Sequence, residues 1–306
     1  MKLVVVGSVG LDDVETPFGK VERALGGSAT YFSLSASYFA RTGFVGVVGN
    51  DWPEEANTLL ASRGVDLKGL ERADGLTFRW AGRYGFDLNS RDTLLTELNV
   101  FADFNPVLPA EYKSAKYLFL GNIHPELQLR VLEQSTSAEF VALDTMNFWI
   151  SGTPEPLRKV LSRVHGLLIN DSEARQLSGE TNIVSAARAI SAMGPSLIII
   201  KRGEYGALVY RDGDFFFVPG YPLENVIDPT GAGDSFAGGF MGYIAARDDL
   251  RWSTLCQAMV AGSTVASFCV EGFSVDRLRT LTLTEISQRA ARFRALTDFT
   301  PLPTEL

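Results

Sequence analysis

The sequence predicts an α/β fold, with a doubly wound, mainly parallel sheet, flanking helices and a small β-lid. From residue 116 onward, short apolar runs that end in polar residues alternate with helical stretches, which is typical of a parallel sheet. The polar residues collect where the strands end, and doubly wound sheets bind ligands there. Residues 77–84 alternate large aromatic with small or polar side chains, which indicates a strand outside this sheet.

The composition limits the classes to which the protein can belong. Its 306 residues are 46% hydrophobic, enough for a sizeable core, and a net charge of −8 argues against a general nucleic-acid-binding protein. Cys256 and Cys269 are the only cysteines and form neither a disulfide framework nor a zinc motif, so we expect a reducing, cytoplasmic environment. The N-terminal apolar run is too short for a signal peptide, and no run approaches the ~18 residues of a membrane span. We therefore expect neither nucleic-acid nor membrane partners.

The first predicted strand, residues 3–6, is continuously apolar and leads into a polar segment. Gly7 and Gly10 in this segment do not have the spacing of a dinucleotide-binding fingerprint. Asp12 and Asp13 follow, near the end of the strand, where a ligand of a doubly wound sheet is expected. The alternative is that both are solvated carboxylates of a turn.

A glycine pair, Gly26 and Gly27, precedes a predicted helix that runs to residue 38. Ser28 and Tyr31 lie in its first turn. Tyr31 is either a ring beside the substrate or a core residue, because its spacing also fits the buried face of the helix.

The lid is expected to contain three strands, at 14–21, 77–84 and 94–101. Its aromatic residues form a core, a dimer interface or a stacking surface, and its arginines face either a ligand or solvent. The residues concerned are Phe78, Trp80, Tyr84, Arg79 and Arg83. The predicted boundaries are 14–21 and 73–104 for the lid, and 1–13, 22–72 and 105–306 for the main domain.

Two strand ends in the second half of the chain carry candidate ligand-binding residues. Asn170 and Glu173 fit an N-cap with a first-turn acid as well as a ligand site. Lys201, Gly203 and Gly206 follow the next strand, where glycines permit close backbone approach. The expected strands of the main sheet are 43–48, 117–120, 140–143, 166–169 and 197–200, followed by a hairpin of 207–210 and 215–218, with helices at 51–62, 185–193 and 255–270.

The segment 228–240 reads as a loop that enters a helix. Gly231 and Gly233 allow backbone geometries that a side chain would block, and apolar residues at helical spacing then follow. The first amides of the helix would be unpaired and would attract an anion at the positive end of the helix dipole. Asp234, in the first turn, either caps the helix or takes a proton from a hydroxyl that attacks phosphorus.

Other catalytic arrangements are absent from the sequence. There is no Gly-x-x-x-x-Gly-Lys-[Ser/Thr] motif, which excludes a P-loop enzyme. His124 and His165 are the only histidines, and neither has a second ligand at useful spacing. A histidine metal site and a Ser-His-Asp triad are therefore not expected.

The segment 228–234 resembles the signature of the PfkB or ribokinase-like family of sugar and nucleoside kinases. Its sequence is Asp228-Pro229-Thr230-Gly231-Ala232-Gly233-Asp234, and the family usually has Thr at the position of Pro229. The glycine pair, Asn170-x-x-Glu173 and Lys201-x-Gly203-x-x-Gly206 resemble further family motifs in the same order. The resemblance covers nearly the whole chain, and the motifs are most similar to those of nucleoside-kinase-like members. It implies a ribokinase-like fold and an ATP-dependent phosphotransferase.

The resemblance also implies roles for single residues. Asp234 would be the catalytic base, and the amides of Gly231, Ala232 and Gly233 would form an anion hole for the transferred phosphate. Mg²⁺ would bind near Asn170 and Glu173, K⁺ near Asp228, and the lid would pair with that of a second subunit in a homodimer. The other residues implied are Asp12, Gly26, Gly27, Ser28 and Tyr31 for the acceptor, and Asn170, Lys201, Gly203, Gly206, Thr230, Gly231 and Gly233 for ATP.

The implied function is transfer of the γ-phosphate of ATP to an alcohol group of a sugar or nucleoside. Tyr31 and the aromatic lid favour a ring-bearing nucleoside. One alternative is a kinase of a sugar or of a cyclic polyol such as an inositol. Another is a catalytically silent nucleotide or sugar sensor, against which the intact Asp234 argues, because a sensor needs no base.

Overall fold

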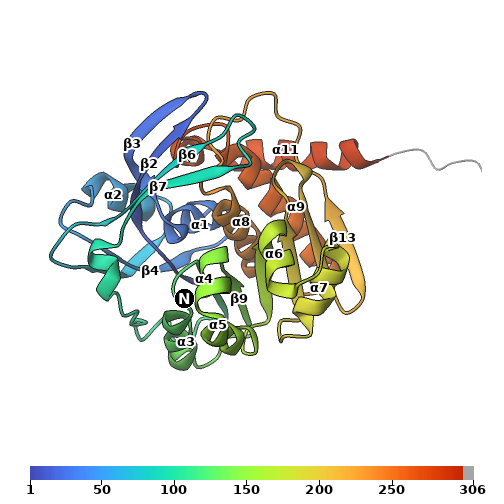
Figure 1. The fold of residues 1–306 in the computed structure, drawn as a ribbon, viewed down its shortest axis with the longest axis horizontal. Coiled ribbons are helices and arrows are strands. Elements are labelled where there is room, and N and C mark those ends of the chain that lie inside the picture. The colour runs from blue at the N-terminus through green and yellow to red at the C-terminus, as the bar shows by residue number, and fades with distance from the viewer. Residues whose placement is uncertain (299–306) are drawn as a thin grey trace, which may run out of the picture.

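A nine-stranded sheet forms the centre of the molecule in the computed structural model, which describes residues 1–298 (Figure 1). All neighbouring strands are parallel except at one edge, where a hairpin adds two antiparallel strands. The predicted fold class is confirmed. The strands, in spatial order, are β13 (Asp214–Val218), β12 (Ala207–Arg211), β11 (Leu197–Lys201), β10 (Gly166–Asn170), β9 (Phe140–Asp144), β8 (Tyr117–Leu120), β1 (Leu3–Val6), β4 (Thr42–Val48) and β5 (Asp66–Arg72).

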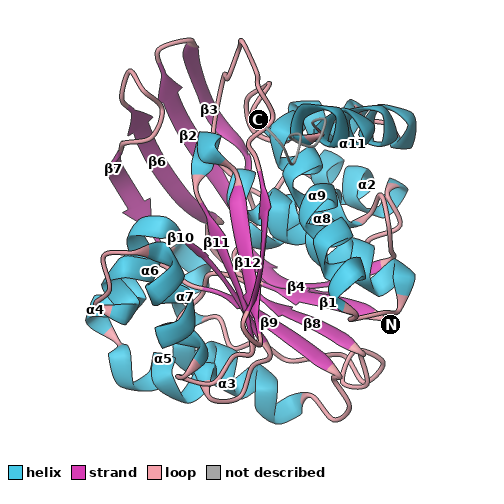
Figure 2. Ribbon diagram, turned by 90° about the vertical axis from the view of Figure 1, so that its right-hand side faces the viewer, coloured by secondary structure: helices cyan, strands magenta, loops and turns pink. Residues whose placement is uncertain are grey.

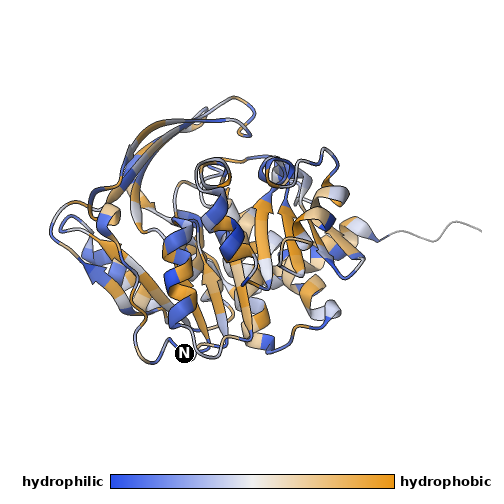
Figure 3. Ribbon diagram, turned by 60° about the horizontal axis from the view of Figure 1, so that its bottom comes forward, coloured by the Kyte–Doolittle hydropathy of each residue, from blue (hydrophilic) through white to orange (hydrophobic). Residues whose placement is uncertain are grey.

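The first strand, β1, lies in the interior of this sheet, between β4 and β8. Its side chains alternate between two cores, because Leu3 and Val5 belong to one buried cluster and Val4 and Val6 to the other. A strand buried on both faces is continuously apolar, and the strands of the main sheet are the most hydrophobic part of the fold (Figure 3).

Helices cover both faces of the sheet, as Figure 2 shows. Those that bury residues with Leu3 and Val5 are α1 (Ser28–Ala36), α2 (Glu54–Ser62), α8 (Ala232–Arg247), α9 (Trp252–Cys269), α10 (Asp276–Thr280) and α11 (Leu283–Thr297). Those that pack with Val4 and Val6 are α3 (Pro125–Gln134), α4 (Asn147–Gly152), α5 (Pro154–Leu161), α6 (Asp171–Ser178) and α7 (Ile183–Ser191). Within residues 1–298, no helix combines the length and the apolar character that crossing a membrane requires.

A second, four-stranded sheet, the lid, rises from one end of the main sheet (Figure 2). Its strands, in spatial order, are β3 (Gly19–Gly26), β2 (Gly10–Thr16), β6 (Phe78–Tyr84) and β7 (Arg91–Glu97). The outer pairs are antiparallel, and the central pair, β2 and β6, is parallel. The predicted small lid is therefore present, with one strand more than expected.

Two of the predicted lid strands were wrong in their bounds. The segment 14–21 is a hairpin of β2 and β3, because Pro17 and Phe18 form its turn. The segment 94–101 is a strand only to Glu97, and a 3₁₀ helix (Asn99–Asp103) follows. The lid sheet takes in residues 10–13 and 22–26, because pairing with β6 and β2 extends these strands toward the main sheet. The division into two domains stays a prediction.

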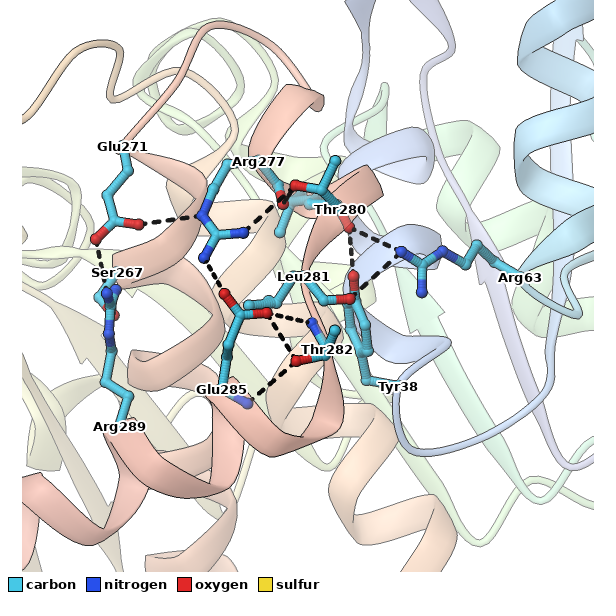
Figure 4. A network of polar contacts seen from close by, with 11 residues as sticks. Tyr38, Arg63, Ser267, Glu271, Arg277, Thr280, Leu281, Thr282, Glu285 and Arg289 are labelled. Carbon is cyan, nitrogen blue, oxygen red and sulfur yellow. Dashed lines mark hydrogen bonds and ion pairs between the residues drawn. The ribbon is translucent and has the colours of Figure 1, made fainter.

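Charged side chains tie the C-terminal helices to each other and to α2 (Figure 4). Arg277 donates to Glu285 at 2.5 Å and to Glu271 at 3.3 Å, and Arg289 donates to Glu271 at 2.7 Å. Arg63, at the end of α2, donates to the carbonyl oxygen of Arg279 at 2.6 Å. This network holds the segment between α9 and α10 in place.

Candidate active site

The predicted loop-to-helix segment has the expected form. Gly231 adopts a φ of +75°, and α8 begins at the next residue. A Cβ at Gly231 would overlap the ring of Tyr31, which is buried beneath the loop. Ala232 differs from expectation, because its amide donates to the carbonyl oxygen of Pro229 at 3.2 Å. Within the described residues, no protein acceptor contacts the amides of Gly231 and Gly233, and these are free to bind an anion.

Asp234 lies in the first turn of α8 and has a proton affinity suited to a base. Burial and the nearby Asp144 carboxylate raise its pKa to about 7, while Lys201 and Arg91 act in the opposite direction. A carboxylate with this pKa accepts a proton readily near neutral pH. Capping alone would not require such burial.

A lysine lies beside the unpaired amides. Lys201, at the end of β11, donates through Nζ to Asp144 Oδ2 at 2.9 Å. The same Nζ lies 3.0 Å from where a Cβ of Gly233 would be. The cation and the amides therefore converge on one small volume. Asp144 was not predicted to be a site residue, although it ends β9 just as Asn170 ends β10.

Asn170 and Glu173 form a capping box at the start of α6. Asn170 Oδ1 accepts from the Glu173 amide at 2.8 Å, and Glu173 Oε2 accepts from the Asn170 amide at 3.0 Å. Burial and the Asp144 carboxylate raise the pKa of Glu173 to about 7. The two interpretations left open by the sequence are compatible, because the cap orients Glu173 toward the same cluster of charges.

Asp12 lies in β2 of the lid and not at the end of β1, because the chain leaves the main sheet after Val6. Its carboxylate occupies the space that a Cβ at Gly26 would need. Burial, and then Asp228, Asp234 and Asp13, raise its pKa to about 8. Asp12 therefore faces the same site as Asp234.

Two acceptor-side residues predicted from the sequence lie at the start of α1. Gly27 has a φ of +89°, and a Cβ there would meet the backbone of Ser8 and Val9. Ser28 Oγ accepts from the Ser8 amide at 3.1 Å. These contacts hold the N-terminus of α1 against the loop that follows β1.

Asp228 connects the loop of residues 228–231 before α8 (the candidate catalytic loop) to the segment between α9 and α10. Its carboxylate is buried and accepts from the amide of Thr230 at 2.8 Å and from that of Ser274 at 3.2 Å. The 3₁₀ turn Gly203–Tyr205 and Gly206 follow Lys201 directly in the chain, and Asn89 of the lid donates to Glu204 at 3.3 Å. The assignment of Gly203 and Gly206 to the nucleotide stays a prediction.

The lid presents one face to the site, and alternation along its strands determines which residues belong to it. Asp12, Trp80 and Tyr84 share this face. Arg91, opposite Tyr84 in the β6–β7 pair, shares it too and was not predicted. Arg79 and Arg83 point the other way and pair with Asp13, Glu97 and Glu15, so the solvent-facing alternative is correct for both.

Replacing Asp12 with asparagine is expected to stabilise the substrate-free protein at pH 8. The folded-state pKa of Asp12 is raised to about 8 from 3.8, so ionisation costs stability as the pH rises through this window. The variant removes that cost and should raise Tm at pH 8 by about 2–4 °C for each kcal/mol recovered. Near pH 4 the gain should vanish. Asp13→Asn is the matched control, because it loses the contact with Arg79 and gains nothing.

Comparison with known proteins identifies the family. A cytidine kinase of Thermococcus kodakarensis is 34% identical over 255 residues, covering 81% of this chain and 90% of the relative. A nucleoside kinase of Methanothermobacter thermautotrophicus is 25% identical over 311 residues, covering 94% and 91%. The solved structure of the Burkholderia thailandensis nucleoside kinase with inosine has the same fold, with a TM-score of 0.77 at 20% identity over 98% of this chain and all of that one. The model of the pfkB family carbohydrate kinases matches residues 2–278, and the chain therefore belongs to this family.

Proposed function

We propose that the protein is an ATP-dependent nucleoside kinase, with cytidine as the first candidate acceptor. The observation that carries the chemistry is the position of Asp234, beside the free amides of Gly231 and Gly233 and near Lys201. The similarity to a cytidine kinase over most of both chains supports the nucleoside. Phosphoryl transfer needs positioned reactants, charge stabilisation and a proton acceptor, and these residues can supply all three.

In the proposed reaction, Asp12 accepts hydrogen bonds from two neighbouring hydroxyls of the ribose. Asp234 takes the proton from the attacking hydroxyl. The amides of Gly231 and Gly233, together with Lys201, stabilise the negative charge of the phosphoryl group in transit. The loop of Gly203 and Gly206 lies along the nucleotide.

Two carboxylates at the ends of β9 and β10 could serve a divalent cation. The described residues hold no group of three or more such ligands, so waters and phosphates would complete the coordination. Glu173 and Asp144 supply carboxylate oxygens, which are the ligands that Mg²⁺ prefers, and their mutual repulsion is relieved by positive charge. Asn170 orients Glu173 through the capping box. Bound Mg²⁺ would offset charge on the phosphates of ATP. We further propose that Asp228 supports a monovalent cation, K⁺ being the one to test.

An acceptor panel tests this function. Cytidine, uridine, adenosine, inosine, ribose, fructose and myo-inositol are each incubated with ATP and Mg²⁺, in K⁺ or in Na⁺, and ADP and the phosphorylated product are measured. We expect a nucleoside to have the highest kcat/KM. If a sugar or inositol exceeds every nucleoside, the acceptor assignment is wrong.

A sugar or cyclic polyol is the second candidate acceptor. The observation in its favour is that the Asp12 carboxylate can accept hydrogen bonds from two adjacent hydroxyls, and sugars and cyclic polyols carry such hydroxyls as well as ribose does. The same panel separates the two candidates, because a nucleoside-specific site should discriminate cytidine from ribose by kcat/KM.

A further inference from the structure

One buried hydrogen bond joins the lid to the catalytic loop. Thr230 Oγ1 donates to Tyr84 Oη at 3.1 Å. Tyr84 is the last residue of β6 and only 8% exposed, and Thr230 is 9% exposed. The two residues are far apart in the sequence, so the bond exists only while the lid lies over the loop.

Thr230 is held at each of its polar atoms. Its amide donates to Asp228 at 2.8 Å, its carbonyl oxygen accepts from Cys269 Sγ at 3.7 Å, and its hydroxyl binds Tyr84. The next residue is Gly231, where the free amides begin. Any displacement of Thr230 therefore moves those amides relative to Asp234.

The lid makes a second contact at the tip of its β6–β7 hairpin, where Asn89 donates to Glu204. Arg91 lies opposite Tyr84 on the same face of the lid. Arg91 also lies near enough to the carboxylates of Asp12 and Asp234 to lower their pKa values. The lid therefore contacts the protein at two places, at Thr230 through Tyr84 and at Glu204 through Asn89.

We propose that Tyr84 is a positioning residue for phosphoryl transfer: its hydroxyl, brought in by the closed lid, fixes Thr230 and so aligns the anion-binding amides with Asp234. The inference rests on the proposed kinase function for its kinetic consequence. The hydrogen bond itself is a property of the fold and is testable without any acceptor.

The kinetic test uses Tyr84→Phe, Thr230→Val and the double variant, with cytidine, ATP and Mg²⁺. Each single change should lower kcat roughly 3- to 10-fold, because the net free energy of one hydrogen bond corresponds to a factor of this size. The KM for ATP should change less than about 2-fold, because the hydroxyl of Thr230, a residue that the family resemblance assigned to ATP, binds Tyr84 in the structure. The double variant should match the single variants, since both changes remove one interaction. Arg83→Gln is the control, because Arg83 lies next to Tyr84 and pairs with Glu15 on the outer face.

Hydrogen–deuterium exchange of residues 78–97, with no substrate added, tests the same bond independently of turnover. We expect faster exchange in Tyr84→Phe and in Thr230→Val than in the wild type and Arg83→Gln. Multiplicative losses of kcat in the double variant, or unchanged exchange in both single variants, would overturn the proposal. If the wild type phosphorylates no acceptor while exchange rises as expected, the proposed function fails and the Tyr84–Thr230 bond stands.

Discussion

Asp234→Asn is expected to lower kcat by roughly 10²–10⁴-fold and to leave the affinity for ATP nearly unchanged. The amide side chain keeps the shape of the carboxylate but cannot accept a proton. Its loss therefore affects the chemical step more than binding. Steady-state kinetics with the best acceptor of the panel, together with ATP titration, measures both quantities. A variant with near-normal kcat would remove Asp234 from the mechanism.

The pH dependence gives a second check on Asp234. Its pKa is raised to about 7, so the base is protonated below that value and kcat/KM should fall as the pH decreases through it. The same raised pKa means that ionisation destabilises the fold from about pH 4 to pH 7. Asp234→Asn should thus have a higher Tm than the wild type at pH 8. If Asp234 acted only through the dipole of α8, the variant would be less stable, as expected for Asp276→Asn in the first turn of α10.

Gly231→Ala is expected to abolish most activity, with a loss of roughly 10²-fold or more in kcat, and to destabilise the protein by about 2–4 kcal/mol. A side chain at a φ of +75° is strained, and the added methyl group would overlap the ring of Tyr31. Relief of this overlap requires the loop to move away from α1. The amides of Gly231 and Gly233 would then no longer meet the phosphate. Urea unfolding and steady-state kinetics measure the two effects.

Gly179→Ala separates backbone strain from displacement of the loop. Gly179 ends α6 with the same φ of +75°, and a Cβ there meets nothing within 4 Å. This variant should lose about 1 kcal/mol and keep the wild-type kcat. Equal effects of the two substitutions on kcat would contradict the role assigned to the Gly231 loop.

The main sheet was largely predictable because its strands are buried on both faces and therefore apolar without interruption. Leu3–Val6 and Leu197–Lys201 are such strands. Strand β5 was not predicted, since an edge strand with Asp66 and Arg72 at its ends lacks that signature. Helices α10 and α11 were also missed. The first has only five residues, and the capping box of Thr282 and Glu285 that begins the second was overlooked.

The candidate site was predictable where one short segment contains both the backbone amides and the side chain that form it. The run from Asp228 to Asp234 is of this kind, as is the pair Asn170 and Glu173. Tyr84 and Arg91 were not assigned to the site because strand register decides which face they occupy. Alternation along β6 places Trp80 and Tyr84 on one face, but only the packing of the lid on the main sheet decides which face covers the site.

The interior position of β1 affects how the chain folds while it is being synthesised. This strand is made before the other strands of the sheet, and one of its two neighbours, β8, ends only at Leu120. The partners of Asp12 in the site come later still, since Asp234 and the Ser274 contact to Asp228 belong to the last third of the chain. One side of β1 therefore stays unpaired until β8 has been made, and substrate binding cannot stabilise the nascent chain before its last third has been made. Its yield in the cell should depend on chaperones that bind before release from the ribosome.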